Sequence, residues 1–241
     1  MKHLFCLAVT AIVCMAAPRA AADSALSADE LLASVRNTMT SQGERDVQGQ
    51  LRKGRTKVPF GMSVRGDVIA FQYKPGTGWK RFDLHIKGKG VEIAEVVGGK
   101  AAMMPAARYT ESIAGTDICY EDMSLRFLYW KNGRILDKGV DPRVKGRDCW
   151  VVEIPNPKPS VGQFAWMRAW IDKENGTTWQ IDGYDAQGRL KKRFSITSVQ
   201  KLKDGTWFFK QMKLEVRDPA NPARTVALDY IEMDDLPNKK S

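Results

Sequence analysis

WMRAWIDKENGTTWQIDGYDAQGRLKKRFSI, residues 166–196, holds three apolar segments that are separated by two turn signals. The first signal is Asn175-Gly176, and the second runs from Asp185 to Gly188. Polar, glycine-containing pieces of this kind reverse the direction of an antiparallel chain. The stretch therefore predicts three consecutive antiparallel strands joined by short turns.

The same organisation extends toward the N-terminus. In KVPFGMSVR, residues 57–65, every second side chain is large and apolar, and RFDLHIK, residues 81–87, repeats the pattern. Alternation with a period of two is typical of a strand with one buried face. About ten or eleven such segments, with few helices between them, predict a single, strongly curved antiparallel sheet. The fold class is therefore mainly β.

Two helices are expected beside this sheet. Ser27 followed by Glu30 forms a capping box, and Leu31, Leu32, Val35 and Met39 then fall on one helical face. A second, short helix is expected from Glu121 to about Leu128, because its acidic start suits the positive end of the helix dipole.

The N-terminus has the features of a secretory signal. Lys2 precedes an apolar run, and Ala20 and Ala22 fit the small-residue rule for cleavage before Asp23. A run of about 14 apolar residues is short for a membrane span, which needs roughly 20; an uncleaved anchor helix is the alternative. We expect residues 1–22 to be removed and residues 23–241 to form a single exported domain. Cys6 and Cys14 do not follow small residues, so neither suits lipid attachment.

Export affects the interpretation of Cys119 and Cys149, the two cysteines beyond the leader. A catalytic thiol would need a nearby histidine, and only His85 is present in the mature chain. A zinc site would need four ligands. In an oxidising compartment two such cysteines usually pair. We therefore predict a Cys119–Cys149 disulfide.

The sequence gives little sign of an enzyme. It contains no G-x-S-x-G, no H-E-x-x-H and no glycine-rich phosphate loop. His85 shares a strand face with Arg81 and Asp83, which favours a solvated position. We expect no catalytic residues, no metal and no cofactor.

The formal net charge of +10 favours anionic lipid head groups or acidic partners; the alternative is a soluble surface whose charge serves no particular partner. The basic residues are scattered and accompany no nucleic-acid motif, so nucleic-acid binding is not expected.

Seven Trp and ten Met residues suggest either a tightly filled interior or a cavity for an apolar ligand. FAWMRAWI, residues 164–171, is apolar on both faces, which fits a strand buried between two layers as well as one that encloses a cavity. One face of each alternating strand must point inward. The candidate lining residues are Phe60, Met62, Val64, Phe82, Leu84 and Ile86.

Three motifs, in this order, resemble the bacterial outer-membrane lipoprotein-sorting protein family. They are GTDICYEDMSLRFLYW (115–130), GRDCWVVEIP (146–155) and residues 166–196. The similarity extends from Asp46 to Met233. It implies a LolA-like fold, which is an unclosed β-barrel of about eleven strands with helices covering an apolar cavity. It also implies that neither a cofactor nor catalytic residues are used.

This resemblance implies a periplasmic carrier for a lipid or for the acyl chains of a lipoprotein. Its partners would be an inner-membrane donor and an outer-membrane acceptor, with peripheral contact to the membrane itself. A different reading of the same fold is a periplasmic sensor or adaptor that acts through protein contacts.

Overall fold

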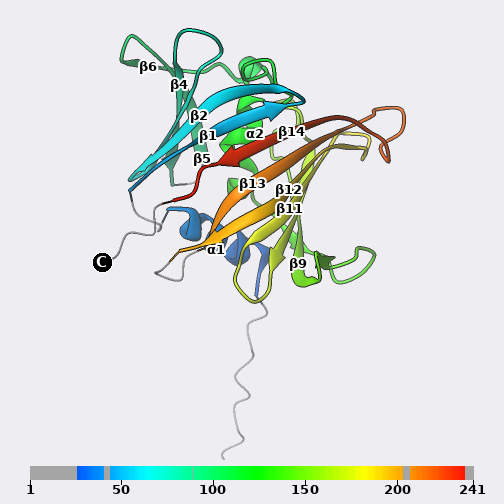
Figure 1. Ribbon diagram of the computed structural model, residues 1–241. Helices are drawn as coiled ribbons and strands as arrows, with labels where there is room; N and C mark the ends of the chain where they lie inside the picture. Colours follow the sequence, from blue (N-terminus) through cyan, green and yellow to red (C-terminus); the bar gives the residue numbers. More distant parts are fainter. Residues whose placement is uncertain (1–25, 41–43, 89, 203–206, 237–241) are drawn as a thin grey trace, which may run out of the picture.

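The computed structural model describes residues 26–40, 44–88, 90–202 and 207–236. The expected signal peptide, residues 1–22, lies outside the described residues. The dominant feature is one antiparallel sheet that curves around the helices (Figure 1). Its strands fall into two groups, which we call the first arm and the second arm.

The first arm comprises six strands: β1 (Arg45–Lys53), β2 (Thr56–Arg65), β3 (Val68–Tyr73), β4 (Lys80–Lys87), β5 (Gly90–Val97) and β6 (Lys100–Met103). The second arm comprises eight strands: β7 (Arg134–Ile135), β8 (Arg143–Val144), β9 (Arg147–Pro155), β10 (Trp166–Asp172), β11 (Thr178–Tyr184), β12 (Leu190–Lys201), β13 (Trp207–Arg217) and β14 (Thr225–Met233).

The strand order is β6-β5-β4-β3-β2-β1-β14-β13-β12-β11-β10-β9-β7, with β8 paired to β9. Each arm is a meander, and the two arms meet where β1 pairs with β14, from Gly49 opposite Met233 to Lys53 opposite Asp229. The strands β6 and β7 are the two ends of the order, so the barrel is unclosed as expected. The structure has more strands than expected because it includes the short β6, β7 and β8, of four, two and two residues.

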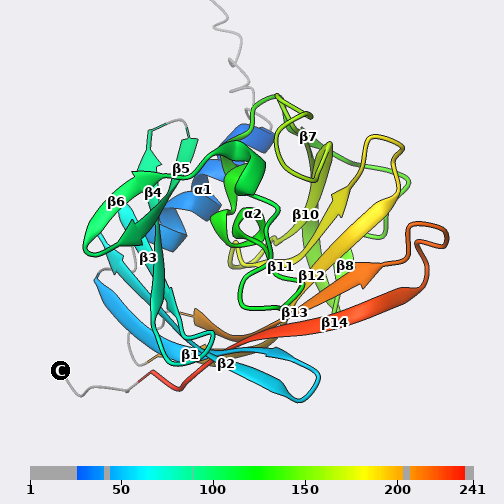
Figure 2. The same ribbon diagram turned by 90° about the horizontal axis from the view of Figure 1, so that it is seen from above.

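The helices lie on the concave side of the sheet, between the two arms (Figure 2). They are α1 (Ala28–Thr40), the 3-10 turn η1 (Ala106–Arg108), α2 (Tyr120–Ser124) and the 3-10 turn η2 (Arg126–Tyr129). The predicted capping box is confirmed, since the Glu30 amide donates to the Ser27 hydroxyl at 3.2 Å and the Ser27 amide donates to Glu30 at 2.8 Å. Among the described residues, no helix has both the length and the apolar character to cross a membrane.

The second expected helix is broken in two. Leu125 separates α2 from η2 and has a φ of 50°, in the left-handed region. This conformation is uncommon for a residue with a branched apolar side chain, and it ends the α-helical hydrogen-bonding pattern. We refer to residues 120–129 as the plug, because they occupy the centre of the concave side in Figure 2.

An aromatic stack joins the first arm to the plug. The rings of Phe60 and Phe71 lie 5.6 Å apart, and those of Phe71 and Phe82 lie 5.1 Å apart. Tyr120, at the start of α2, meets Phe82 edge-on at 5.0 Å, and its hydroxyl lies 3.0 Å from that of Tyr73. The alternating apolar face that the sequence predicted for β2 and β4 thus forms part of the core.

The strand β10 is buried on both faces. Met167, Ala169 and Ile171 belong to the main core, whereas Trp170 belongs to a second cluster outside the sheet. The loop before β8 covers this cluster, and the Trp170 indole donates to the Asp141 carbonyl at 3.0 Å. Burial between two layers therefore accounts for the two-sided apolar character of the strand.

The predicted Cys119–Cys149 disulfide is absent from the structure. Cys119 and Cys149 are both free and buried. Cys149 lies in the outer cluster with Trp170 and Trp179, whereas Cys119 begins α2 on the concave side. The two thiols therefore belong to different packing layers. An oxidising compartment favours pairing of two cysteines only where the fold brings them together, and here it does not.

Candidate binding cavity

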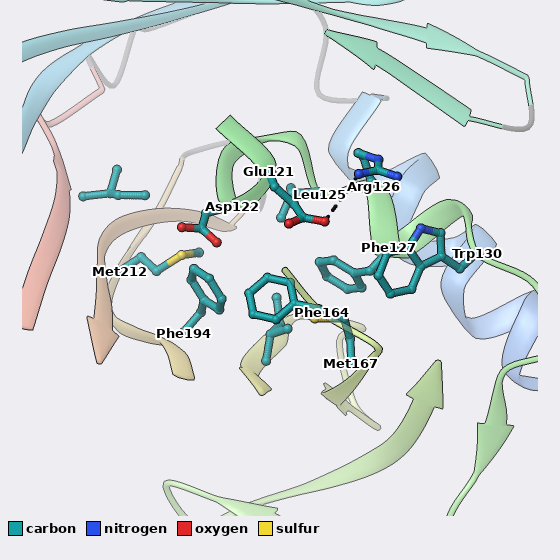
Figure 3. Close-up of a pocket in the computed structure, with 12 residues that line it drawn as sticks. Glu121, Asp122, Leu125, Arg126, Phe127, Trp130, Phe164, Met167, Phe194 and Met212 are labelled. Atoms are coloured by element: carbon teal, nitrogen blue, oxygen red, sulfur yellow. Dashed lines mark hydrogen bonds and ion pairs between the residues drawn. The ribbon is translucent and has the colours of Figure 1, made fainter. Parts of the chain in front are cut away.

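The plug divides the concave interior into three adjoining pockets. Leu125 and Met212 line all three pockets, so the pockets meet at these two side chains. Figure 3 shows the first pocket, in which Phe127 and Phe164 face each other and Met212 and Phe194 lie beside Asp122. Most of the lining side chains are apolar, as is usual for a site that binds a small apolar ligand.

The second and third pockets are the larger ones, with volumes of about 770 Å³ and about 1110 Å³ when space open to solvent is included. The second and third pockets share Met62, Ile69, Leu125, Leu128, Phe209 and Met212. They are two parts of one interior space beside the plug.

The predicted lining residues separate into two groups. Met62, Val64, Leu84 and Ile86 line the second or third pocket. Phe60 and Phe82 line none of the three, because both are only 1% exposed and belong to the aromatic stack. Period-two alternation identified the inward face but could not separate packed positions from open ones. Ligand binding by the first group remains a prediction.

Sequence reasoning missed the contribution of the second arm and the helices. Phe209 and Met212 come from β13, and Arg36 comes from α1. The Arg36 guanidinium donates to the Leu128 carbonyl and lies over the Tyr129 ring, 5.2 Å from its centroid. The packing of α1 against the plug brings Arg36 to this site, and the sequence of the helix carries no signal for that contact.

Beneath the plug lies a buried polar cluster formed by Asp122, Lys192 and Gln163. The Lys192 amine lies 2.5 Å from the Asp122 carboxylate and donates to the Asp117 carbonyl at 2.8 Å. The Gln163 amide donates to the other Asp122 oxygen at 2.9 Å, and the Cys119 backbone amide donates to Asp122 at 2.9 Å. The cluster ties α2 to β12 and to the loop before β10.

The electrostatics of this cluster keep its ion pair charged and its thiol neutral. Burial opposes the charge of the Lys192 amine, but the Asp122 carboxylate outweighs it, and the pKa of Lys192 is raised. Burial also raises the pKa of the Cys119 thiol to about 12, which leaves it protonated at neutral pH. A protonated, enclosed thiol is a poor nucleophile, which favours a packing role for Cys119.

The position of Lys192 on the inward face of its strand could have been recognised from the sequence. It alternates with Leu190, Phe194 and Ile196 in RLKKRFSI, which places it on the same side of β12 as Phe194. An inward-facing lysine requires a buried partner. The partner could not be identified, because Asp122 is 70 residues away in the chain.

Glu121 is a second buried carboxylate, at the edge of the first pocket. It accepts the Gln163 backbone amide at 2.7 Å and lies 3.3 Å from the Arg126 guanidinium, as the dashed line in Figure 3 marks. Burial raises the pKa of Glu121 despite these partners. His85 is partly buried on β4, where Arg81 and Asp83 form a two-bond ion pair at 2.7 and 2.9 Å. No group of three metal-ligating side chains occurs in the part of the chain that the structure describes.

A family model with the description "Uncharacterized protein" matches residues 99–239, more than half of the chain. The chain belongs to this family. No curated protein sequence matches it significantly.

The fold is similar to that of several solved structures. An outer membrane lipoprotein-sorting protein domain from Vibrio parahaemolyticus has a TM-score of 0.67 and 15% identity, over 86% of this chain and 90% of that chain. A LolA superfamily protein from Nitrosomonas europaea has a TM-score of 0.63 and 11% identity, over 88% and 93%. A DUF1329 family protein from Desulfovibrio piger has a TM-score of 0.55 and 15% identity, over 86% and 89%. The LolA-like fold that the sequence motifs implied is thus confirmed.

Proposed function

We propose that this protein is a periplasmic carrier that shields the acyl chains of a lipid or lipoprotein in the space beside the plug. The observation that carries the proposal is the apolar interior around Leu125 and Met212, which three adjoining pockets share. Each buried CH₂ group contributes roughly 0.8 kcal/mol, so contact with this apolar lining would stabilise a bound acyl chain.

The proposal includes the expected processing of the chain. Residues 1–22 would direct export and be cleaved, and residues 23–241 would form the mature carrier. A carrier would receive its cargo from a donor at one membrane and pass it to an acceptor at another. No step in that exchange requires a catalytic group.

Release of a cargo requires the cavity wall to move, and the plug is the element placed to do so. Its two ends are fixed differently. Tyr120 and Asp122 are anchored by the aromatic stack and the buried ion pair, whereas η2 contacts α1 through Arg36. Movement of α1 together with η2 would enlarge the second pocket, which Arg36 and Leu128 both line. The Asp122 anchor would remain in place.

Binding of a fluorescent fatty-acid analogue to delipidated protein tests the proposal. Met212→Trp should fill the shared space and reduce probe binding, because Met212 lines all three pockets. Met103→Trp is the matched control, since Met103 is 55% exposed on β6 and lines none of these pockets. Probe binding should be unchanged in this control.

Wild-type protein that binds no acyl probe after delipidation would defeat the carrier proposal. A sensor or adaptor that acts through protein contacts would then be the better reading of the fold. Equal loss of binding in Met212→Trp and Met103→Trp would show that the probe binds outside the cavity.

A further inference from the structure

The turns at one end of the first arm combine exposed apolar side chains with basic ones. Trp79, in the β3–β4 turn, is 52% exposed, and Val97, at the end of β5, is 71% exposed. Arg81 lies opposite Val96, and Val97 lies opposite Lys100, so the two turns are neighbours at one end of the sheet. They stand side by side at the top of Figure 1.

This end of the arm has an excess of basic residues in its turns. The β1–β2 turn lies at the same end, because Lys53 is opposite Thr56. Residues 52–57, 74–81 and 96–103 form these three turns and their flanks, and they contain eight Lys or Arg and no Asp or Glu. Three of the basic side chains are occupied, since Arg52 binds Glu232, Lys53 binds Asp117 and Arg81 binds Asp83.

The other five basic side chains are Arg55, Lys57, Lys74, Lys80 and Lys100. Within the described residues no ion pair joins any of them to a carboxylate, although Lys80 is near enough to Glu95 to help lower the pKa of that carboxyl. Like charges at one end repel one another, and folding gains nothing from their gathering. A pattern of this kind therefore indicates an anionic partner.

We propose that this basic turn surface, made of Trp79, Val97, Lys74, Lys80 and Lys100, docks the protein on an anionic lipid membrane. Tryptophan favours the boundary between head groups and acyl chains, where its ring is buried and its N–H stays hydrated. Lysines around it attract anionic head groups, and the exposed valine adds apolar area that can enter the interface.

The position of this surface gives the bound protein an orientation. One end of the cavity is lined by Val64 and Ile69, which flank the β2–β3 turn, and by Ile86 and Val91, which flank the β4–β5 turn. Those turns lie at the opposite ends of the same strands from Trp79. A protein docked through the basic turn surface would point this end of the cavity away from the membrane.

Flotation with vesicles tests the docking. Wild-type protein should float with vesicles of equal parts phosphatidylcholine and phosphatidylglycerol, and less with pure phosphatidylcholine. Lys80→Gln/Lys100→Gln should weaken this binding by roughly tenfold or more. Lys138→Gln/Lys158→Gln is the matched control, because it removes the same charge from two exposed lysines of the second half of the chain. It should leave binding close to the wild-type value.

The apolar contribution is tested separately. Val97→Ser and Trp79→Ser should each weaken vesicle binding severalfold. Val226→Ser is the control, since Val226 is also an exposed valine (51%) but lies on β14, in the second arm. Loss of binding in the lysine variant without any loss in Trp79→Ser and Val97→Ser would overturn the part of the proposal that places these two side chains in the membrane interface.

Two further outcomes would also overturn it. One is that wild-type protein does not float with either kind of vesicle. The other is that both lysine pairs weaken binding equally, since net charge would then explain the effect. The cavity-filled variant Met212→Trp should float as wild type does, so failure of docking and failure of acyl binding are distinguishable.

Discussion

At the scale of single residues, the distinction between packed and open inward positions decides what a substitution does. Phe60 is fully enclosed by the aromatic stack, whereas Met62, two residues along the same strand face, lines the two larger pockets. Truncation in a filled core leaves a cavity, but truncation beside existing space adds little to it.

We therefore expect Phe60→Ala to lower the free energy of unfolding by about 3–5 kcal/mol. Met62→Ala should cost markedly less stability and should instead change binding of the acyl probe. Urea denaturation of both variants makes the comparison. Equal losses of stability would show that the space beside Met62 is filled in solution.

The buried ion pair leads to a second prediction at this scale. Lys192→Met leaves the Asp122 carboxylate buried without its cation, which should cost about 3–5 kcal/mol of stability. Adding Asp122→Asn removes the stranded charge and should recover a large part of that loss. Denaturant titration of the single and double variants measures the coupling. A double variant no more stable than Lys192→Met would mean that Lys192 acts through packing and not through the pair.

At the scale of elements, the pairing of β1 with β14 is what joins the two arms. Gly49 allows this close approach, because a Cβ atom there would lie 2.1 Å from the Glu232 carbonyl oxygen. The pairing of β1 with β14 is stabilised by the Glu232 carboxylate, which accepts hydrogen bonds from the Gln50 amide at 2.6 Å and from the Arg52 guanidinium at 2.8 Å.

Gly49→Ala should therefore force the two strands apart and lower the melting temperature by several degrees or more. Gly61→Ala is the control, because its Cβ would first meet the flexible Gln48 side chain, at 3.0 Å. Thermal unfolding followed by circular dichroism compares them. Similar melting temperatures for the two variants would show that the pairing of β1 with β14 tolerates a larger distance between the strands.

The helices and strands also show which features of the fold could be predicted from the sequence. The strands, the capping box at Ser27 and the curved antiparallel sheet follow from local signals, since alternation and turn residues act over a few positions. That the sheet is left unclosed came from the family resemblance. The left-handed Leu125, the partnership of Asp122 with Lys192 and the free cysteines do not, because each depends on which distant segments the sheet brings together. The plug therefore contains most of what the sequence could not predict about the site.

At the scale of the whole molecule, four buried or partly buried carboxylates fall into two classes with opposite pH dependence. Burial raises the pKa of Glu121 and of Asp229. Glu153 and Glu232 are also partly buried, but the guanidinium groups of Arg168, Arg134 and Arg52 outweigh that burial and lower their pKa values.

The two classes contribute to stability in different pH ranges. A carboxylate with a raised pKa stabilises the fold below its unfolded pKa, and this contribution is lost as the pH rises through its folded pKa. Glu121 and Asp229 should therefore make the protein more stable in mild acid than at neutral pH. A carboxylate with a lowered pKa contributes stability above its unfolded pKa that is lost as the pH falls through its folded value. Glu153 and Glu232 should therefore cause stability to fall again in stronger acid.

We expect the melting temperature to rise from neutral pH to a maximum in mild acid, near about pH 5, and to fall below about pH 4, where model carboxyl groups titrate. Glu121→Gln should raise the melting temperature at neutral pH and reduce the rise toward mild acid, because the neutral amide removes the cost of a buried charge. Glu153→Gln should lower it at neutral pH and reduce the fall in strong acid, since Arg134 and Arg168 then lose their shared anion. Calorimetry of the three proteins across this range separates the two classes. A wild-type melting temperature that falls steadily as the pH is lowered from neutral would contradict this prediction, because the arginine-bound carboxylates would then dominate over the whole range.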